Sequence, residues 1–354
     1  MTQRILLALL LLLLVGTSAP LAAQTSHKVK IGFITDMTGS WGAQSQIGAK
    51  MAARELAEDQ WPVEIVFGDH RSKVSRAVEA TQKILAASDV DALYVESSPA
   101  VAATAVLAGQ NKKLFVGVTE LENFLAQAPT AVKAYIDYAK GCREIARYWQ
   151  RMHYQNIGML KPEGEYGELC EKAAREVFPG LTTEAYRSGQ VLSSQLLNLK
   201  NKKVEAIFNI GLEADVMATF QAMADLNWDA PLGLFEQSGF TKEVISRYRR
   251  MLEGTTVFGF SDVSHDFSAK VKAFDAHGGK NLEATALAYV HIKQLVTAVR
   301  SCKSGEIACQ LDALVHSPAD SLLGFTRFEN RIASYESYIE VWSGGSLSLF
   351  KSYN

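Results

Sequence analysis

From residue 29 to residue 260 the sequence alternates between short apolar runs and longer amphipathic segments, and this alternation limits the fold more than any other feature. The short runs are rich in Val, Ile, Leu and Phe, which is typical of strands buried on both faces of a sheet. The segments between them repeat apolar residues three and four positions apart, as helices do. Strands and helices in regular succession predict parallel sheets covered by helices, an α/β fold. The predicted strands comprise residues 29–34, 63–68, 92–95, 114–118, 157–160, 182–186, 204–210, 232–235 and 256–260.

Two series of strands and helices are predicted, because the helix Asp137–His153 stands between the first four strands and the next five. Domains of this type comprise about 100–150 residues, so a chain of 354 residues accommodates two lobes. We expect the break near 134–140, and we expect the helices after residue 260 to complete the first lobe. The last segments are predicted strands: 325–329 and 334–342 as an antiparallel hairpin, then 346–351.

The N-terminus has the pattern of a secretory signal. Arg4 precedes the apolar run Ile5–Val15, and small residues follow up to Ala22-Ala23. The run is too short to span a bilayer comfortably. We therefore predict a cleaved signal peptide over residues 1–23 and an exported mature chain.

Export permits disulfide bonds between the four cysteines. Cys302 and Cys309 flank a short Gly/Ser-containing loop and are candidates for one bridge, and Cys142 and Cys170 are candidates for another. Three pairings of four cysteines remain open at this point. Neither the cysteines nor the seven histidines have the spacing of metal ligands, so no metal site is predicted.

Charge and motifs exclude several classes of function. The formal net charge of −2 does not favour nucleic acid as a partner. The sequence contains no GxSxG, Walker, HExxH or GxGxxG motif, so we predict neither an enzyme nor a bound cofactor.

Polar and aromatic residues follow the predicted strands of the first lobe, where α/β sheets bind their ligands. Ser98, as an expected helix N-cap before Pro99, would offer a hydroxyl and free N–H groups to a carboxylate. Helix capping alone would explain the serines equally well, and core packing is the alternative for the tryptophan. The candidate ligand-binding residues of this lobe are Trp41, Ser97, Ser98, Ala100, Thr119 and Glu120.

Several short motifs occur in an order and spacing typical of one family. The opening segment 31–42 reads IGFITDMTGSWG, Gly68-Asp69 precedes an Ala/Val-rich helix, and Ser-Ser-Pro-Ala stands at 97–100. Glu-Tyr-Gly follows at 165–167, and Phe235-Glu236 precedes Gly239. The chain resembles the periplasmic substrate-binding proteins of ABC transporters, in the leucine/isoleucine/valine-binding branch of the type I periplasmic-binding fold.

This resemblance implies a two-lobed fold in which each lobe is a mostly parallel sheet flanked by helices, with a hinge of three crossovers. The implied lobes are 24–137 with 262–325, and 138–261 with 326–354, with the ligand cleft between them.

The resemblance also implies roles for individual residues. Ser98 with its neighbouring turn, together with Thr119, would hold a ligand carboxylate from the first lobe. Tyr166 would close over the ligand from the second lobe, and Glu236 would accept its ammonium group.

Departures from the family pattern leave the ligand open. Pro99 and Val101 stand where serine or threonine is usual, and Glu120 places an acid where a ligand carboxylate is expected. A like charge there is costly. Either Glu120 points away, or the ligand is not a standard branched-chain amino acid.

The function implied is that of a monomeric periplasmic protein that delivers a small-molecule ligand to an inner-membrane ABC permease and its ATPase. An amino acid or amino-acid-like compound is the expected ligand. An amide, urea-like or aromatic acid ligand is the alternative within the fold. A ligand-sensing module for a signalling partner, and an exported enzyme, are alternatives of other classes.

Overall fold

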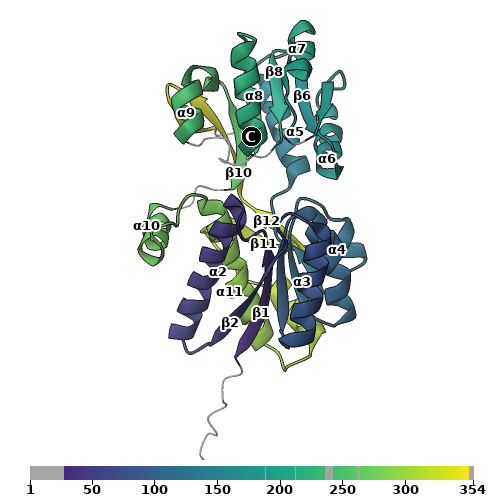
Figure 1. Ribbon diagram of the computed structural model, residues 1–354, viewed down its shortest axis with the longest axis vertical. Helices are drawn as coiled ribbons and strands as arrows, with labels where there is room; N and C mark the ends of the chain where they lie inside the picture. The colour runs from purple at the N-terminus through teal and green to yellow at the C-terminus, as the bar shows by residue number, and fades with distance from the viewer. Residues whose placement is uncertain (1–27, 188, 212, 236–241, 261–263, 351–354) are drawn as a thin grey trace, which may run out of the picture.

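The computed structural model describes residues 28–187, 189–211, 213–235, 242–260 and 264–350. The predicted signal peptide, residues 1–23, and the predicted ligand contact Glu236 lie outside these ranges. In the described part of the chain, two lobes lie one above the other and are joined by a narrow waist (Figure 1). Each contains a seven-stranded sheet with helices on both faces. The predicted two-lobed α/β fold is confirmed.

The first sheet has the strand order β11-β12-β5-β4-β3-β1-β2, and its central strands run parallel. Neighbouring residues of a strand face opposite sides of a sheet. Accordingly, Phe33 belongs to the core that includes α2 and α11, and Ile34 to the core that includes α3 and α4. Its strands are β1 (Val29–Thr35), β2 (Val63–Asp69), β3 (Ala92–Glu96), β4 (Leu114–Val118), β5 (Ala131–Lys133), β11 (Phe325–Glu329) and β12 (Ile332–Tyr335). Its helices are α2 (Ser40–Glu58), α3 (Val74–Ala87), α4 (Ser98–Gln110), η1 (Asn123–Ala126), α10 (His265–Phe274), α11 (Leu282–Arg300) and α12 (Ile307–Val315).

The second sheet has the order β14-β13-β10-β9-β8-β6-β7. One face is covered by α5, whose Trp149 packs edge-on against Phe208 of β8 with ring centroids 4.6 Å apart. The other face shares a core with α7, α8 and α9. The strands are β6 (Ile157–Pro162), β7 (Thr182–Tyr186), β8 (Ala206–Asn209), β9 (Leu232–Phe235), β10 (Thr256–Phe260), β13 (Ser337–Ser343) and β14 (Ser346–Phe350). The helices are α5 (Tyr138–Arg151), α6 (Glu165–Arg175), α7 (Ser193–Asn201), α8 (Glu213–Asp225), α9 (Lys242–Tyr248) and η3 (Arg249–Leu252).

The chain passes between the sheets after β5, between β10 and α10, and between β12 and β13. The last crossing differs from the expected boundary at 325/326. Ile332 of β12 pairs with Lys133 of β5, so residues 326–335 belong to the first sheet. The predicted hairpin is also wrong in its second strand. β11 pairs with β12, the chain leaves the first sheet at Glu336, and β13 pairs with β10 instead of β11.

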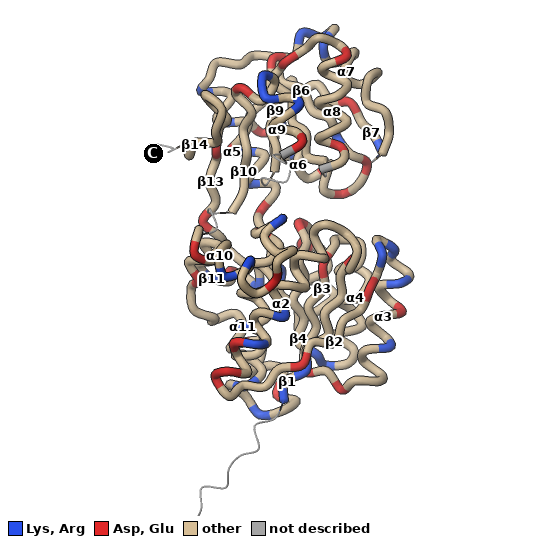
Figure 2. The backbone as a smooth tube through the Cα atoms, turned by 60° about the vertical axis from the view of Figure 1, so that its left-hand side comes forward, with Lys and Arg blue, Asp and Glu red and all other residues tan. Residues whose placement is uncertain are grey.

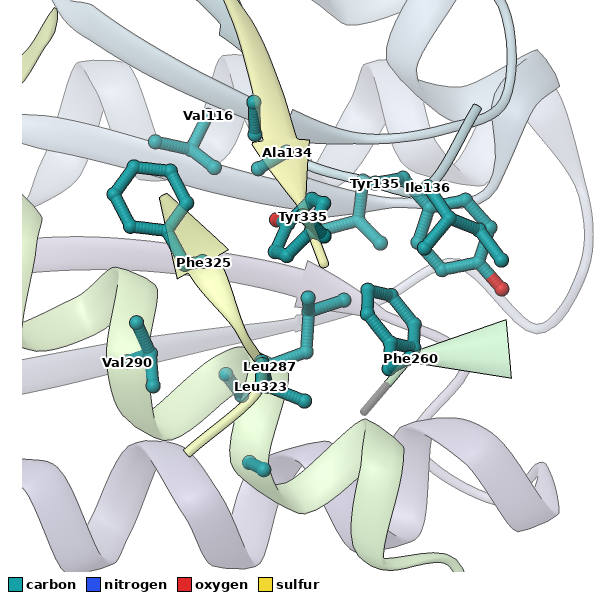
Figure 3. Packing of buried hydrophobic residues seen from close by; sticks show 14 of the residues in the cluster. Val116, Ala134, Tyr135, Ile136, Phe260, Leu287, Val290, Leu323, Phe325 and Tyr335 are labelled. Atoms are coloured by element: carbon teal, nitrogen blue, oxygen red, sulfur yellow. The ribbon is translucent and has the colours of Figure 1, made fainter. Parts of the chain in front are cut away.

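The three crossings meet over one aromatic core, which is drawn in Figure 3. Phe260 of the second crossing packs edge-on against Tyr135 of the first and Tyr335 of the third, with ring centroids 5.8 and 5.0 Å apart. Leu287 of α11 and Phe325 of β11 lie beside them. A change in the angle between the lobes therefore alters these ring contacts.

Disulfides reinforce both lobes. Cys142 of α5 is bonded to Cys170 of α6, and Cys302 is bonded to Cys309 in α12. The predicted Cys302–Cys309 bridge is confirmed, and the pairing left open by the sequence is resolved. None of the helices described combines the length and hydrophobicity needed to cross a membrane.

Candidate functional site

The carboxyl ends of the parallel strands of both sheets point toward the waist (Figure 1). A direct contact joins the lobes at this level, because the Asn123 side chain of η1 donates to the Glu165 carboxylate of α6 over 3.2 Å. Figure 2 shows Asp and Glu residues beside the waist on both lobes. Strand ends of parallel sheets are where ligands bind in such folds, so the candidate site lies here.

Ser98 and Thr119, from neighbouring strand ends, form one hydrogen-bonded chain with Glu120. The Thr119 hydroxyl donates to Ser98 Oγ over 2.8 Å, and the Ser98 hydroxyl donates to Glu120 Oε2. The Leu121 N–H in turn donates to Thr119 Oγ1 over 3.0 Å. Glu120 is half-buried and does not point away from the serine turn. The Ser98 hydroxyl, which was expected to bind a ligand carboxylate, thus binds the carboxylate of Glu120.

The serine turn differs from its predicted geometry in two ways. Ser97, not Ser98, precedes the helix, and its side chain makes no capping hydrogen bond. Ser97 has a φ of 81°, a region that residues other than glycine rarely adopt and that occurs preferentially at functional sites. Ala100 is only 3% exposed and lies in the core that includes α3 and α4, so its side chain cannot face a ligand.

Trp41 lies in the first turn of α2 and is half-buried. Its ring meets Tyr135 edge-on at 5.9 Å, Tyr135 stacks on Tyr138 at 5.9 Å, and Tyr138 stacks on Phe235 at 4.2 Å. This aromatic row, Trp41–Tyr135–Tyr138–Phe235, leads from the first lobe through the crossing to the second. The tryptophan therefore packs within the molecule and also borders the candidate site.

Glu96 is a residue of this edge that the sequence analysis missed. It ends β3, is 3% exposed, and accepts hydrogen bonds from Thr35 (2.5 Å), Ser45 (2.9 Å) and Tyr94 (3.3 Å). Burial raises the pKa of its carboxyl to about 7, although these hydrogen bonds oppose the rise. A glutamate that ends an otherwise apolar strand, as in ALYVE, is the sequence signal for such a group.

Lys133 is a second buried charge near the site. It ends β5, is 1% exposed, and its Nζ lies 3.5 Å from a Glu122 carboxylate oxygen. Burial lowers the pKa of the ammonium, and Glu122 opposes that shift most, followed by Asp137 and Glu120. One ammonium therefore pairs with Glu122 and interacts electrostatically with two further carboxylates.

On the second lobe, Tyr166 lies in the first turn of α6 and is half-buried. Burial raises the pKa of its hydroxyl, and Asp215 of α8 and Glu120 of the first lobe raise it further. Asp215 is 3% exposed and accepts the Gly189 N–H over 3.3 Å. An acid of each lobe thus acts electrostatically on the Tyr166 hydroxyl.

The described residues include no cluster of His, Cys, Asp or Glu side chains arranged to hold a metal ion. A depression of about 470 Å³ lies between β2 and α3, and one of about 430 Å³ lies beside the β11–β12 hairpin. None of the predicted site residues lines either depression. We place the candidate site at the strand ends instead, because the polar and charged side chains described above lie there.

Comparisons with solved structures agree with the fold. The chain is similar to a leucine-binding protein of Thermotoga maritima, with a TM-score of 0.77, 19% identity, and coverage of 91% of this chain and 98% of that one. It is similar to a branched-chain amino acid binding protein of Streptococcus pneumoniae in complex with isoleucine, with a TM-score of 0.77, 19% identity, and coverage of 90% and 97%. It is also similar to a solute-binding protein of R. palustris in complex with benzoate, with a TM-score of 0.76, 15% identity, and coverage of 91% of this chain and 95% of that one.

The search of curated proteins found no match. The family model for periplasmic binding proteins matches residues 28–339, which include most of both lobes. The two seven-stranded sheets, the three crossings and this match agree: the chain belongs to the periplasmic binding protein family.

Proposed function

We propose that this protein is the exported solute-binding component of an ABC uptake transporter and captures a small polar ligand between its lobes. The observation that supports this most is the meeting of the two polar strand-end regions at the waist, joined by the Asn123–Glu165 hydrogen bond. Proteins built this way close on a ligand by hinge motion, because contacts to both lobes favour the closed state. The crossings and their aromatic core provide that hinge.

In this proposal the ligand is an amino acid or amino-acid-like compound. Ser98 meets it from the first lobe, with the Ser97 turn and the backbone of Ala100 beside it, and Thr119, which is 1% exposed, holds Ser98 through its hydrogen bond. Trp41 and Tyr166 border it with their rings, and Glu236 accepts an ammonium group. The protein is a periplasmic monomer that hands its ligand to an inner-membrane permease driven by an ATPase. A ligand of the amide, urea-like or aromatic acid kind is the second candidate, and the Ser98–Glu120 hydrogen bond favours its amide and urea-like members.

The test is a thermal-shift screen of the mature chain, residues 24–354, against amino acids, amides and aromatic acids, followed by calorimetry of each compound that raises Tm. A ligand that binds only the folded state stabilises it, by about 2.7 kcal/mol at a hundred times Kd. We expect Tyr166→Ala to weaken binding of the best compound at least tenfold.

The matched control is Tyr154→Ala. Tyr154 is also half-buried in the second lobe, but it lies between α5 and β6 at the end away from the waist. Its replacement should leave Kd unchanged. The proposal is wrong if no compound raises Tm, or if the two tyrosine variants weaken binding equally.

A further inference from the structure

We propose that the protein presents Glu120 to its ligand as a fixed carboxylate, so that the ligand group bound there is a cationic nitrogen group such as an amine, amidine or guanidine. A free carboxylate is rejected at this position. The inference depends on the proposed function, since it names the chemical class of ligand that the same site takes.

The first step concerns the hydroxyl protons. A serine or threonine hydroxyl has one proton to donate. The Ser98 proton goes to Glu120, and the Thr119 proton goes to Ser98. The two hydroxyls expected to hold a ligand carboxylate are therefore already engaged, and they orient Glu120 instead.

The second step concerns charge. Two like charges 4 Å apart at an effective dielectric constant of about 20 weaken binding by about three orders of magnitude. A ligand carboxylate beside Glu120 would incur this loss, whereas a cation at the same distance would gain from the same interaction. Glu120 also keeps a free Oε1, to which no hydrogen bond of the described residues is assigned, and a ligand N–H can donate to it.

The third step is the neighbouring ammonium, Lys133. It would favour an anionic ligand if it were uncompensated. Its Nζ lies 3.5 Å from Glu122, and Asp137 and Glu120 are also close enough to raise its pKa. These carboxylates compensate Lys133, so it does not by itself favour an anionic ligand.

The fourth step is the second lobe. Tyr166 is half-buried in the first turn of α6 and interacts electrostatically with Glu120 of the first lobe and Asp215 of its own lobe. Aromatic faces attract cations, by about 0.5–1 kcal/mol at exposed sites and more when water is excluded. The Trp41 and Tyr166 rings therefore favour the same class of ligand as the carboxylates do.

The experiment compares matched probes that differ at the charged group. Calorimetry of the mature chain is run with benzamidine, benzamide and benzoate, and with 3-methylbutylamine and leucine, which differ by the carboxylate. We expect benzamidine to bind at least tenfold more tightly than benzamide, and benzoate to bind most weakly. 3-Methylbutylamine should bind more tightly than leucine.

Two variants assign the effect to Glu120. Glu120→Gln should weaken benzamidine at least tenfold and strengthen benzoate. Glu58→Gln removes the same charge from the far end of α2, where the side chain is 69% exposed, and should change neither. Ser98→Ala keeps the carboxylate, so it should still reject benzoate.

The inference is wrong if benzoate binds more tightly than benzamidine, or leucine more tightly than 3-methylbutylamine. Either result would leave the proposed function, solute binding, intact. Unchanged benzamidine affinity in Glu120→Gln, or identical effects of Ser98→Ala and Glu120→Gln, overturns the inference as well. If no probe binds and the wider screen also fails, the proposed function fails with it.

Discussion

Replacing Glu96 by glutamine should stabilise the protein above neutral pH and not below pH 4.5. The carboxyl is 3% exposed and has a pKa of about 7 in the folded chain, against 4.5 in the unfolded chain. The folded state therefore holds the proton more tightly. The stability that this provides is fully present below pH 4.5 and is lost as the pH rises to 7.

The magnitude follows from the difference of about 2.5 pKa units. At 1.36 kcal/mol per unit, ionising Glu96 in the folded state removes about 3 kcal/mol. Glutamine has nearly the same shape and does not titrate. The free energy of unfolding of Glu96→Gln minus that of the wild type should therefore rise by about 3 kcal/mol between pH 4.5 and pH 8, on top of a constant offset from altered hydrogen bonds to Thr35 and Ser45.

Urea unfolding followed by circular dichroism at half-unit pH steps measures this difference. Glu58→Gln, on the solvent-exposed face of α2, is the control and should give a flat difference. A difference for Glu96→Gln that is independent of pH, or that falls as pH rises, would refute the reasoning that burial outweighs the hydrogen bonds to this carboxyl.

Three further predictions concern stability. Gly48→Ala should destabilise the protein by about 3 kcal/mol, because its Cβ would lie 1.9 Å from a backbone oxygen of α11. Gly109→Ala in α4 is the control: its Cβ meets only ordinary contacts, so it should stabilise the protein by up to about 1 kcal/mol. Equal effects of the two variants in thermal unfolding would contradict this. Burial lowers the pKa of His291 to about 4, so stability should fall by up to about 3 kcal/mol as pH drops from 6.5 to 4, and His291→Gln should remove that slope. Replacing both Cys142 and Cys170 by serine should cost about 3–4 kcal/mol, since the disulfide closes a separation of 28 residues, and an unchanged urea midpoint would disprove it.

The sheets were predictable because each strand is defined by its own residues. A run such as Val29–Thr35 is apolar on both faces, and only a strand between two helical layers needs that. Which sheet a strand joins is a different matter. Residues 326–335 were assigned to the wrong lobe because pairing with Lys133 of β5 depends on a partner two hundred positions away. Nothing in the local pattern of β11 and β12 identifies that partner.

The proximity of Ser98 and Thr119 was predictable, and the hydrogen bonding around them was less so. Adjacent parallel strands end at the same edge, which brings Ser98 and Thr119 together. The direction of their hydrogen bonds depends on side-chain rotamers, so the sequence raised the question whether Glu120 points away but did not predict its hydrogen bond with Ser98. The Glu96 network joins residues 61 and 51 positions apart, and its hydroxyl partners have no shared sequence signal.

The low sequence identity to structures of similar fold also reflects the difference between buried strands and the loops at their ends. At 15–19% identity this chain keeps the architecture seen in proteins crystallised with isoleucine and with benzoate. Small and β-branched residues in buried strands can be exchanged among themselves while the sheets persist, whereas loops at the strand ends change without cost to the core. Ligand class is therefore decided by a few loop residues that the fold does not constrain. In this chain the loop after β4 contributes Glu120, a charge that an α-carboxylate ligand would have to displace from Ser98. The class of ligand therefore depends on the chemistry of that loop and not on the fold, and the affinity of Glu120→Gln for benzamidine and benzoate tests it.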